Sequence, residues 1–443
     1  MPRSFLITLC IAIVVAVTTA APAVARSLIR DADIEYALGR LAQPLIAAAG
    51  LNANRIDILV INDDSMNAFV VNDRAVFLHS GMILRLDTAA ELQAVIAHEL
   101  AHIANGHIAR RMTNRRAAGT VGGIAMALGA VAAASGEAGA GAAMAVGAAN
   151  SANRRFLTHT RAEEAAADAS GVRFMADAGV DPTAAAKVLN RFRGQEALSV
   201  DRQDPYIRSH PLTRDRIRAV EGLAAALPVR PGGDSMADYW FARAQGKLSA
   251  FLRAPSWTLR RLGDDASSDI TMMRRAVALH RQPDPDAARD AINRLVAARP
   301  EDPFVHELKG QILLESRAFG PAIAAYEQAA ALAPRNALVL AGLGRALLTR
   351  EDSASTRRAL DVLESARARD PRDARMMRDL ALAHARLGQN AMASLATAER
   401  YALLGRGTDA SLHARRALGA LPQGSAAWRR ADDILRAFEN ANN

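Results

Sequence analysis

The C-terminal half of the chain repeats with a period that few folds share. Pro300 and Pro334 are 34 residues apart, and Pro371 follows 37 residues later. The residues before each proline also recur, in the order small, small, large, small. In the two clearest copies these positions hold Gly310, Ala322, Tyr326 and Ala329, then Gly344, Ala359, Leu363 and Ala366. The pattern predicts stacked helix pairs, because small residues let paired helices cross closely and each proline can begin a helix.

This order of residues is typical of tetratricopeptide repeats. Weaker copies cover about 269–300 and 374–401, so we expect an α-solenoid over residues 269–443. A linker composition begins at Pro228, and residues 229–268 are expected to form a linker and helical connection. Residues 26–228 are then expected to form a separate domain.

The sequence of this first domain predicts helices around a small sheet. Aromatic residues make up only 4% of the chain, which favours closely packed helices over large sheets. Helical spacing occurs at 28–50, 89–111, 161–178 and 182–192, and strand-like apolar runs occur at 56–61 and 75–79. We therefore expect a mainly α chain with a small β-sheet in its N-terminal half.

The first 25 residues have the composition of a secretory signal peptide. An apolar run from Phe5 to about Val17 precedes small residues that end at Ala25, where cleavage is expected. An uncleaved anchor is the alternative, although the run is short for a membrane span. The only cysteine, Cys10, lies inside this segment. A mature chain without it has no thiol ligand, so any transition metal must be held by histidines and carboxylates.

The formal charge of +9 does not by itself indicate a nucleic-acid partner. The basic residues are interleaved with acidic ones, and no basic block carries aromatic residues. We therefore expect no nucleic-acid binding. The Ala- and Gly-rich residues 117–152 leave two alternatives open: a flexible loop or helical hairpin near the active site, and a hairpin in contact with a membrane.

The helical segment 89–111 carries the sequence His98-Glu99-Leu100-Ala101-His102. Two histidines four residues apart lie on one helix face, where both can bind a single zinc ion. Glu99 lies beside them and can take a proton from a water that the metal activates. A purely structural zinc site has no use for this carboxylate. The motif therefore predicts zinc-dependent peptide hydrolysis, with Glu99 as the catalytic base.

A hydrolytic zinc site also needs a third protein ligand and an open fourth position. No further histidine follows the motif at the short spacing that metzincins use, so the ligand must come from elsewhere. The helical segment that begins at Arg161 offers Glu163, Glu164 and Asp168. If Glu164 binds zinc, Asp168 lies one turn on and can accept the other N–H of a liganding imidazole. The residues alone leave Glu163 as a rival ligand and a solvated acidic patch as the alternative to both.

Three other histidines lie close to these segments or to a predicted strand. His107 is nine residues after His98, near the opposite side of the expected helix, and is interpreted as packing or support for the ligands. His79 ends a predicted strand, which could pair with an extended substrate if it is an exposed edge. His210 precedes a proline in a loop, and its chemistry alone favours a surface position.

Taken together, these residues make the chain resemble the HtpX-like zinc endopeptidases, and among them the BepA-like proteins with C-terminal tetratricopeptide repeats. The resemblance rests on Met66-Asn67-Ala68-Phe69, Gly81, the motif from His98 to His102, His107, Glu164 to Asp168, Ser209-His210-Pro211-Leu212 and the repeats. It implies that Glu164 is the third ligand and that Asp168 supports a histidine. It also gives His210 a catalytic role: the side chain can approach the metal and hold the enzyme latent, or stabilise the oxyanion when displaced.

The resemblance implies a zincin-type metallopeptidase domain followed by a solenoid of tetratricopeptide repeats. It further implies a periplasmic endopeptidase with one Zn²⁺ per chain. Its substrates would be unfolded or misassembled outer-membrane proteins, captured with the help of the repeats. The machinery that assembles outer-membrane proteins would be a further partner. The alternatives are a chaperone or adaptor with a latent or structural zinc site, and a membrane-embedded peptidase anchored through residues 117–152.

Overall fold

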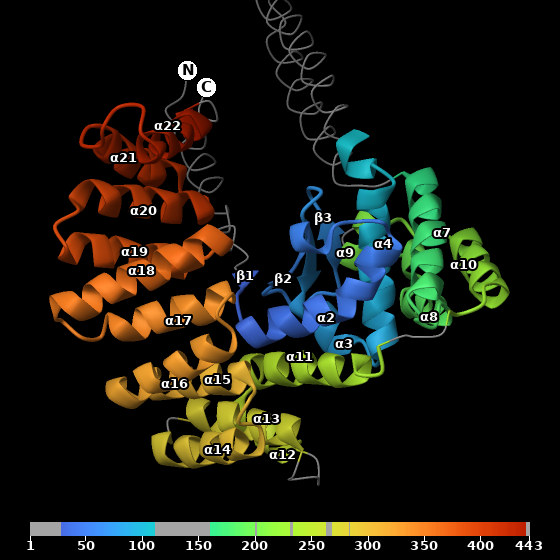
Figure 1. The fold of residues 1–443 in the computed structure, drawn as a ribbon. Helices are drawn as coiled ribbons and strands as arrows, with labels where there is room; N and C mark the ends of the chain where they lie inside the picture. The colour runs from blue at the N-terminus through green and yellow to red at the C-terminus, as the bar shows by residue number, and fades with distance from the viewer. Residues whose placement is uncertain are drawn as a thin grey trace, which may run out of the picture.

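The structure is a computed structural model that describes residues 28–110, 160–199, 202–230, 234–262, 268–282 and 284–439. The expected signal peptide and the Ala- and Gly-rich segment lie outside these ranges. Two helical parts stand side by side, one built around a small sheet and one a stack of helix pairs (Figure 1). Within the described ranges, no helix is both long and apolar enough to cross a membrane.

The sheet has four strands in the order β1-β2-β4-β3. They are β1 (Leu28–Ile29), β2 (Asp57–Ile61), β3 (Ala68–Val70) and β4 (Ala75–His79). β2 and β4 run parallel, whereas β1 and β3 pair antiparallel with them and form the two edges of the sheet that the structure describes. The strands expected at 56–61 and 75–79 are confirmed. The expectation that β4 could be an edge strand is wrong, because β3 covers it.

Among the described residues of the first part, helices surround the sheet, and α4 lies at their centre. They are α2 (Ala32–Ala48), α3 (Ser80–Arg85), α4 (Ala89–Ala104), α7 (Arg161–Asp177), α8 (Thr183–Arg191), α9 (Pro205–Ser209) and α10 (Arg214–Ala226). The helix expected from residue 28 begins only at Ala32, because Leu28 and Ile29 pair with β2. Asp31 caps this later start by accepting bonds from the N–H groups of Asp33 and Ile34.

Helix α4 is buried on nearly all sides and therefore provides a rigid base for its polar residues. It packs against α2, α7, α8 and the strands β3 and β4. Thr88 caps its start, and Gly106, with φ of 69°, allows the chain to turn just after its end. α7 approaches closely because Gly171 lies against the α4 backbone. A Cβ at this position would lie 3.2 Å from the nitrogen of His98.

The residues expected to form a linker and helical connection contain two helices, α11 (Ala237–Leu252) and α12 (Pro255–Arg260). α11 packs against α2 in the first part and against the first helix of the solenoid. It passes beneath α2 and α3 toward the solenoid (Figure 1). This segment is therefore a packed element as well as a connection.

In the described part of the solenoid, five helix pairs follow one another. They are α13 (Asp269–Arg281) with α14 (Pro285–Ala298), α15 (Pro303–Glu315) with α16 (Phe319–Leu332), α17 (Ala337–Leu347) with α18 (Ser353–Arg369), α19 (Ala374–Arg386) with α20 (Asn390–Leu403), and α21 (Gly407–Leu418) with α22 (Ala426–Glu439). A Cβ on Gly310 would lie 2.6 Å from Tyr326, and one on Gly344 would lie 2.4 Å from Leu363. The predicted fold class is confirmed, and the small residues do permit close crossing.

Ion pairs join the solenoid to the edge of the sheet. Arg30, which follows β1, pairs with Asp370 at the end of α18. Arg372 extends the contact, with its Nη1 atom 2.6 Å from Oδ2 of Asp57 in β2. A second contact is formed by Arg243 of α11, whose Nε atom lies 2.6 Å from Asp33 of α2. The two parts are therefore held together by charged groups as well as by α11.

Candidate metal centre

His98 and His102 lie one turn apart on α4, and their rings converge as the motif predicts. The two Nε2 atoms are 3.1 Å apart, and both side chains are buried. Glu164 of α7 faces them, with one carboxylate oxygen 3.4 Å from Nε2 of His98 and the other 3.4 Å from Nε2 of His102. The structure thus brings three predicted ligands together from two helices that Gly171 allows to pack closely.

The two neighbouring glutamates of α7 have different surroundings. Glu163 is half-buried, and its carboxylate accepts the N–H of Thr160 while the Thr160 hydroxyl accepts the N–H of Glu163, which forms a capping box. Glu164 is completely buried between the histidines. One turn later, Asp168 lies 3.1 Å from Nδ1 of His98. Asp168 therefore lies within hydrogen-bond distance of His98, the histidine that precedes Glu99 in the motif.

His210 follows α9 and completes a cluster of four buried groups. Its Nδ1 atom is 3.2 Å from Nε2 of His98 and 3.1 Å from Oε1 of Glu164. The potential ligand atoms of His98, His102, Glu164 and His210 all lie within 4.8 Å of one another. The surface position that the chemistry of His210 alone favoured is wrong, because the residue is 1% exposed and its ring packs against Tyr206.

Glu99 lies at the same cluster but is not one of the four converging groups. Its side chain is buried, and its Oε1 atom is 3.4 Å from Nε2 of His210. The carboxylate therefore stands beside the candidate ligands, as the motif predicts for a proton acceptor.

Arg216 is a site residue that sequence reasoning missed. It lies at the start of α10, is 5% exposed, and donates two hydrogen bonds to Asp168 at 2.7 and 2.9 Å. Its Nη1 atom is also 3.0 Å from Glu164 and donates to the carbonyl of Pro211 at 2.7 Å. One guanidinium therefore fixes the carboxylates of Glu164 and Asp168 and the loop that carries His210. The only signal in the sequence is its position six residues after His210.

His107 supports the centre from a place that helical periodicity does not predict. α4 ends at Ala104, and the turn at Gly106 brings His107 back, so that its Nδ1 atom lies 2.9 Å from Nδ1 of His102. The expected position on the opposite side of a continuous helix is wrong. The interpretation as support for a ligand agrees with this contact.

Burial and neighbouring charges shift the proton affinities of the cluster in opposite directions. Burial lowers the pKa of His98, but bonds with Asp168 and Glu164 outweigh it and raise the pKa to about 10. Burial holds the pKa of His102 well below its usual value. Burial alone would raise the pKa of Glu164, yet the surrounding histidines bring it well below the ordinary range. The pKa of Asp168 is likewise lowered, because its bonds with His98 and Arg216 outweigh its burial.

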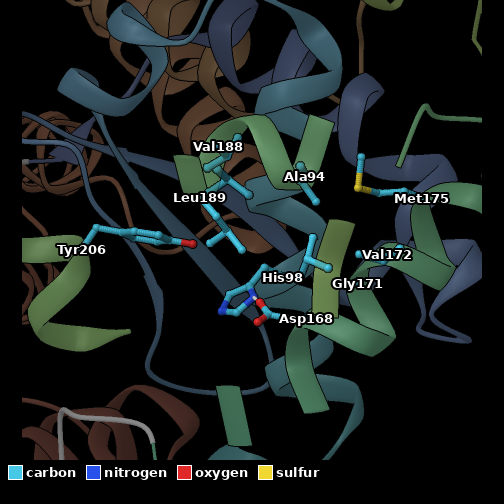
Figure 2. Close-up of a pocket in the computed structure, with 12 residues that line it drawn as sticks. Ala94, His98, Asp168, Gly171, Val172, Met175, Val188, Leu189 and Tyr206 are labelled. Atoms are coloured by element: carbon cyan, nitrogen blue, oxygen red, sulfur yellow. Dashed lines mark ion pairs between the residues drawn. The ribbon is translucent and has the colours of Figure 1, made fainter. Parts of the chain in front are cut away.

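The rear of His98 is closed by apolar side chains. A cavity of only about 20 Å³ lies there, and Figure 2 shows His98 and Asp168 at its edge. α4, α7 and α8 supply its apolar lining, which includes Ala94, Val172, Met175, Val188 and Leu189. This packing holds the imidazole in place and leaves room for about one water molecule.

The four converging groups fit a zinc ion in number, chemistry and spacing. Ligand atoms about 2.0–2.2 Å from zinc in a tetrahedron lie about 3.3–3.6 Å from one another. The separations of His98, His102 and Glu164, at 3.1, 3.4 and 3.4 Å, are close to that value. Nδ1 of His210 lies 3.2 Å from His98 and 3.1 Å from Glu164, as expected of a fourth corner.

A helix with two converging histidines and an adjacent glutamate, facing a carboxylate from a second helix, is an arrangement typical of zinc metallopeptidases. Residues 31–224 match the model of peptidase family M48. The match covers the helices that supply every group of the centre.

Sequence similarity to other proteins extends beyond residues 31–224. A Vibrio cholerae protein whose name includes the words beta-barrel assembly-enhancing protease is 30% identical over 248 residues, which are 51% of this chain and 50% of that protein. The beta-barrel assembly-enhancing protease of Escherichia coli K12 is 26% identical over 392 residues, or 86% of this chain and 77% of that protein. The chain thus spans half to three quarters of the length of these relatives. A solved tetratricopeptide-repeat protein of Thermus thermophilus is 23% identical over 38% of this chain and 100% of its own, with a TM-score of 0.27.

Proposed function

We propose that the protein is a zinc-dependent endopeptidase in which His98, His102 and Glu164 hold the metal. The observation that carries this proposal is the convergence of these three side chains at zinc-ligand spacing, next to the buried carboxylate of Glu99. When bound, Zn²⁺ supplies a Lewis acid that acidifies water and polarises a peptide carbonyl. The family M48 match supports this chemistry.

Each of the other residues has a defined part in this proposal. Glu99 takes a proton from the attacking water and returns it to the leaving amine. Asp168 accepts the Nδ1 proton of His98, which fixes the tautomer that leaves Nε2 free to bind metal. Tautomer and orientation both matter, because only the unprotonated nitrogen can be a ligand. Arg216 keeps Asp168 and Glu164 charged and in position.

His210 is proposed to control access to the fourth position. In the arrangement described above it stands where a water and a substrate carbonyl would have to enter. Catalysis then requires the loop after α9 to move, and a displaced His210 could donate a hydrogen bond to the oxyanion. This position also supports the second candidate function, a chaperone or adaptor whose zinc site stays closed.

We further propose a place in the periplasm and a role in envelope quality control. The support is the name beta-barrel assembly-enhancing protease, which the relatives from Vibrio cholerae and Escherichia coli share. The substrates would be unfolded or misassembled outer-membrane proteins, and the solenoid would help to capture them or to dock on the machinery that assembles them. Repeat solenoids commonly offer such extended binding surfaces.

The metal and the base can be tested separately. We expect the purified chain to retain about one zinc per molecule after dialysis, as measured by plasma mass spectrometry. Glu99→Gln should retain this zinc and lose cleavage of an unfolded protein such as casein by about 10²–10⁴-fold. His98→Ala should lose both. Glu221→Gln is a matched control, because this glutamate is exposed on α10.

The two candidate functions differ in which proteins remain bound. The full-length protein and its Glu99→Gln form are expressed in their native envelope, and the proteins that co-purify with each are compared by mass spectrometry. Enrichment of unassembled outer-membrane proteins on Glu99→Gln is expected of a protease that captures and cleaves them. Equal recovery on both forms would favour the adaptor.

A further inference from the structure

The segment that enters edge strand β3 lies directly against the candidate metal centre. The carbonyl oxygen of Ala68 is 3.3 Å from Nε2 of His210, and Oδ1 of Asn67 accepts a bond from Ser209 at 3.4 Å. Backbone groups alternate in direction along an antiparallel strand. The carbonyl of Asn67 bonds to the N–H of His79 in β4, so the backbone groups of Ala68 and Val70 point to the outer edge. That edge runs beside α4.

One residue, His79, contacts this segment at three alternate positions. Its backbone N–H donates to the carbonyl of Asn67 at 2.9 Å. Its Nδ1 atom is 2.9 Å from Oγ of Ser65, just before the strand. Its ring meets the ring of Phe69 edge to face, with centroids 6.0 Å apart. His79 is 0% exposed, so these contacts form in a site that excludes water.

The turn before β3 is pinned to the same end of β4. Asp63 accepts bonds from the N–H and the hydroxyl of Ser65 at 2.9 and 2.7 Å. Its own carbonyl accepts bonds from Ser80 Oγ at 2.8 Å and from the N–H of Gly81 at 2.9 Å. A Cβ on Gly81 would overlap the carbonyl of Asp64 at 2.0 Å. Glycine at position 81 is therefore needed for this close approach.

Ser65, His79 and Asp63 do not form a nucleophilic triad. In such a triad the carboxylate orients the histidine and the histidine accepts the serine proton. Here the serine hydroxyl donates to Asp63, and the Asp63 carboxylate lies 3.5 Å from the same Nδ1 atom that contacts Ser65. The group therefore holds a turn and does not activate a hydroxyl.

We propose that His79 is a positioning residue that holds residues 65–69 in place through these contacts, so that the outer edge of β3 is aligned for pairing with an extended substrate. The inference rests on the proposed peptidase function. It predicts that loss of the His79 contacts misaligns the main chain of a bound substrate without disturbing the metal ligands. Affinity for substrates long enough to lie along β3 should fall, while the chemical step on a bound substrate is largely retained.

The first test measures how firmly residues 65–70 are held and does not depend on peptidase activity. His79→Leu removes the Nδ1 contact, Ser65→Ala removes only its partner hydroxyl, and His79→Asn restores a polar group near the Nδ1 position. Hydrogen exchange by mass spectrometry should show amides of residues 65–70 exchanging about tenfold faster in the first two variants and less so in His79→Asn. His306→Leu is the control, because this histidine lies in the solenoid, bonded to the carbonyl of Pro300.

The second test separates alignment from general damage. Two fluorogenic peptides share one scissile bond, and the shorter one ends before it can lie along β3. We expect His79→Leu and Ser65→Ala to raise KM about tenfold for the long peptide, with zinc content, kcat and the constants for the short peptide nearly unchanged. If His79→Leu fails to fold, Ser65→Ala carries the test.

The outcomes distinguish this inference from the proposed function. Unchanged exchange at residues 65–70 together with unchanged KM for the long peptide would overturn the role of His79 while leaving the peptidase intact. Equal losses on both peptides would also overturn it, since a general defect is not a loss of alignment. If the zinc-loaded parent chain cleaves no peptide, the proposed function fails, and the exchange data alone decide whether His79 holds the segment.

Discussion

Arg216 joins residues that lie far apart in the sequence, which makes it the most informative side chain outside the motif. It holds Asp168, Glu164 and the carbonyl of Pro211 at once, and its side chain is 4% exposed. Removing one partner from a buried ion pair leaves the other charges without compensation. The contribution of Arg216 therefore extends to both the metal affinity and the stability of the fold.

We expect Arg216→Gln to weaken zinc binding about 10–100-fold, because residues that orient ligands commonly contribute that much. Unfolding should also become easier by about 3–5 kcal/mol. Zinc affinity is measured by competition with a chelating dye, at a temperature where circular dichroism shows the variant folded. Arg218→Gln on the same helix is the control, since its side chain is 74% exposed. Equal affinities in the two variants would rule out the supporting role.

The sequence predicts the centre only in part, and the reason differs from residue to residue. The spacing of His98 and His102 follows from helix geometry, and both converge. Periodicity cannot choose between Glu163 and Glu164, because the choice depends on which side of α7 faces α4. His210 lies 112 residues from His98, and only the fold brings the two together.

At the level of elements, the contact between α4 and α7 sets the distance between the two halves of the centre. Gly171 is the point of closest approach, where an added Cβ would lie 3.2 Å from the His98 nitrogen and 3.3 Å from the carbonyl carbon of Ala97. Both neighbours are backbone atoms in a buried helix, so they cannot rotate away. Any side chain at position 171 must push the helices apart.

Gly171→Ala is therefore expected to destabilise the fold by about 1–3 kcal/mol and to weaken zinc binding, because Glu164 and Asp168 move with α7. Gly222→Ala is the matched control, since a Cβ there meets nothing within 4 Å and helix propensity favours alanine by about 1 kcal/mol. Urea unfolding and zinc competition measure the two effects. A Gly171→Ala chain as stable as the control would show that the helices can separate without cost.

Long elements are easier to predict from this sequence than short ones. The helices of 16 and 17 residues at α4 and α7 carry several turns of helical spacing. β3 has only three residues and is followed by a turn, so too little alternation exists to reveal it. The end of α4 was also missed, because a glycine inside a helical pattern does not show by itself that the chain turns there.

At the scale of the whole molecule, the contact between the sheet-containing part and the solenoid, here called the joint, could not be predicted. The repeats predict a solenoid, but no periodic pattern indicates that Arg30 and Asp370, 340 residues apart, form an ion pair. The joint also buries Glu307 of α15 close to Lys247 of α11, with Oε2 and Nζ 3.8 Å apart. A cavity of about 410 Å³ lies beside it, between β1, α11 and the solenoid.

Burial raises the pKa of Glu307 from 4.5 to about 7, although Lys247 partly opposes the shift. The unfolded chain releases this proton near pH 4.5, whereas the folded chain keeps it until about pH 7. Between these values the folded state binds more protons, so the contribution of Glu307 to the free energy of unfolding falls as pH rises. Glu307→Gln, which cannot ionise, should lack this loss.

Urea unfolding of both forms across the range from pH 4.5 to 7 measures the difference. We expect Glu307→Gln to gain stability relative to the parent chain as pH rises, because the mutated side chain no longer carries a buried charge. Glu301→Gln, at an exposed position just before α15, should follow the parent at every pH. A constant offset between Glu307→Gln and the parent would mean that Lys247 compensates the carboxylate fully. The joint would then be held by a neutralised ion pair, and its strength would not depend on pH in this range.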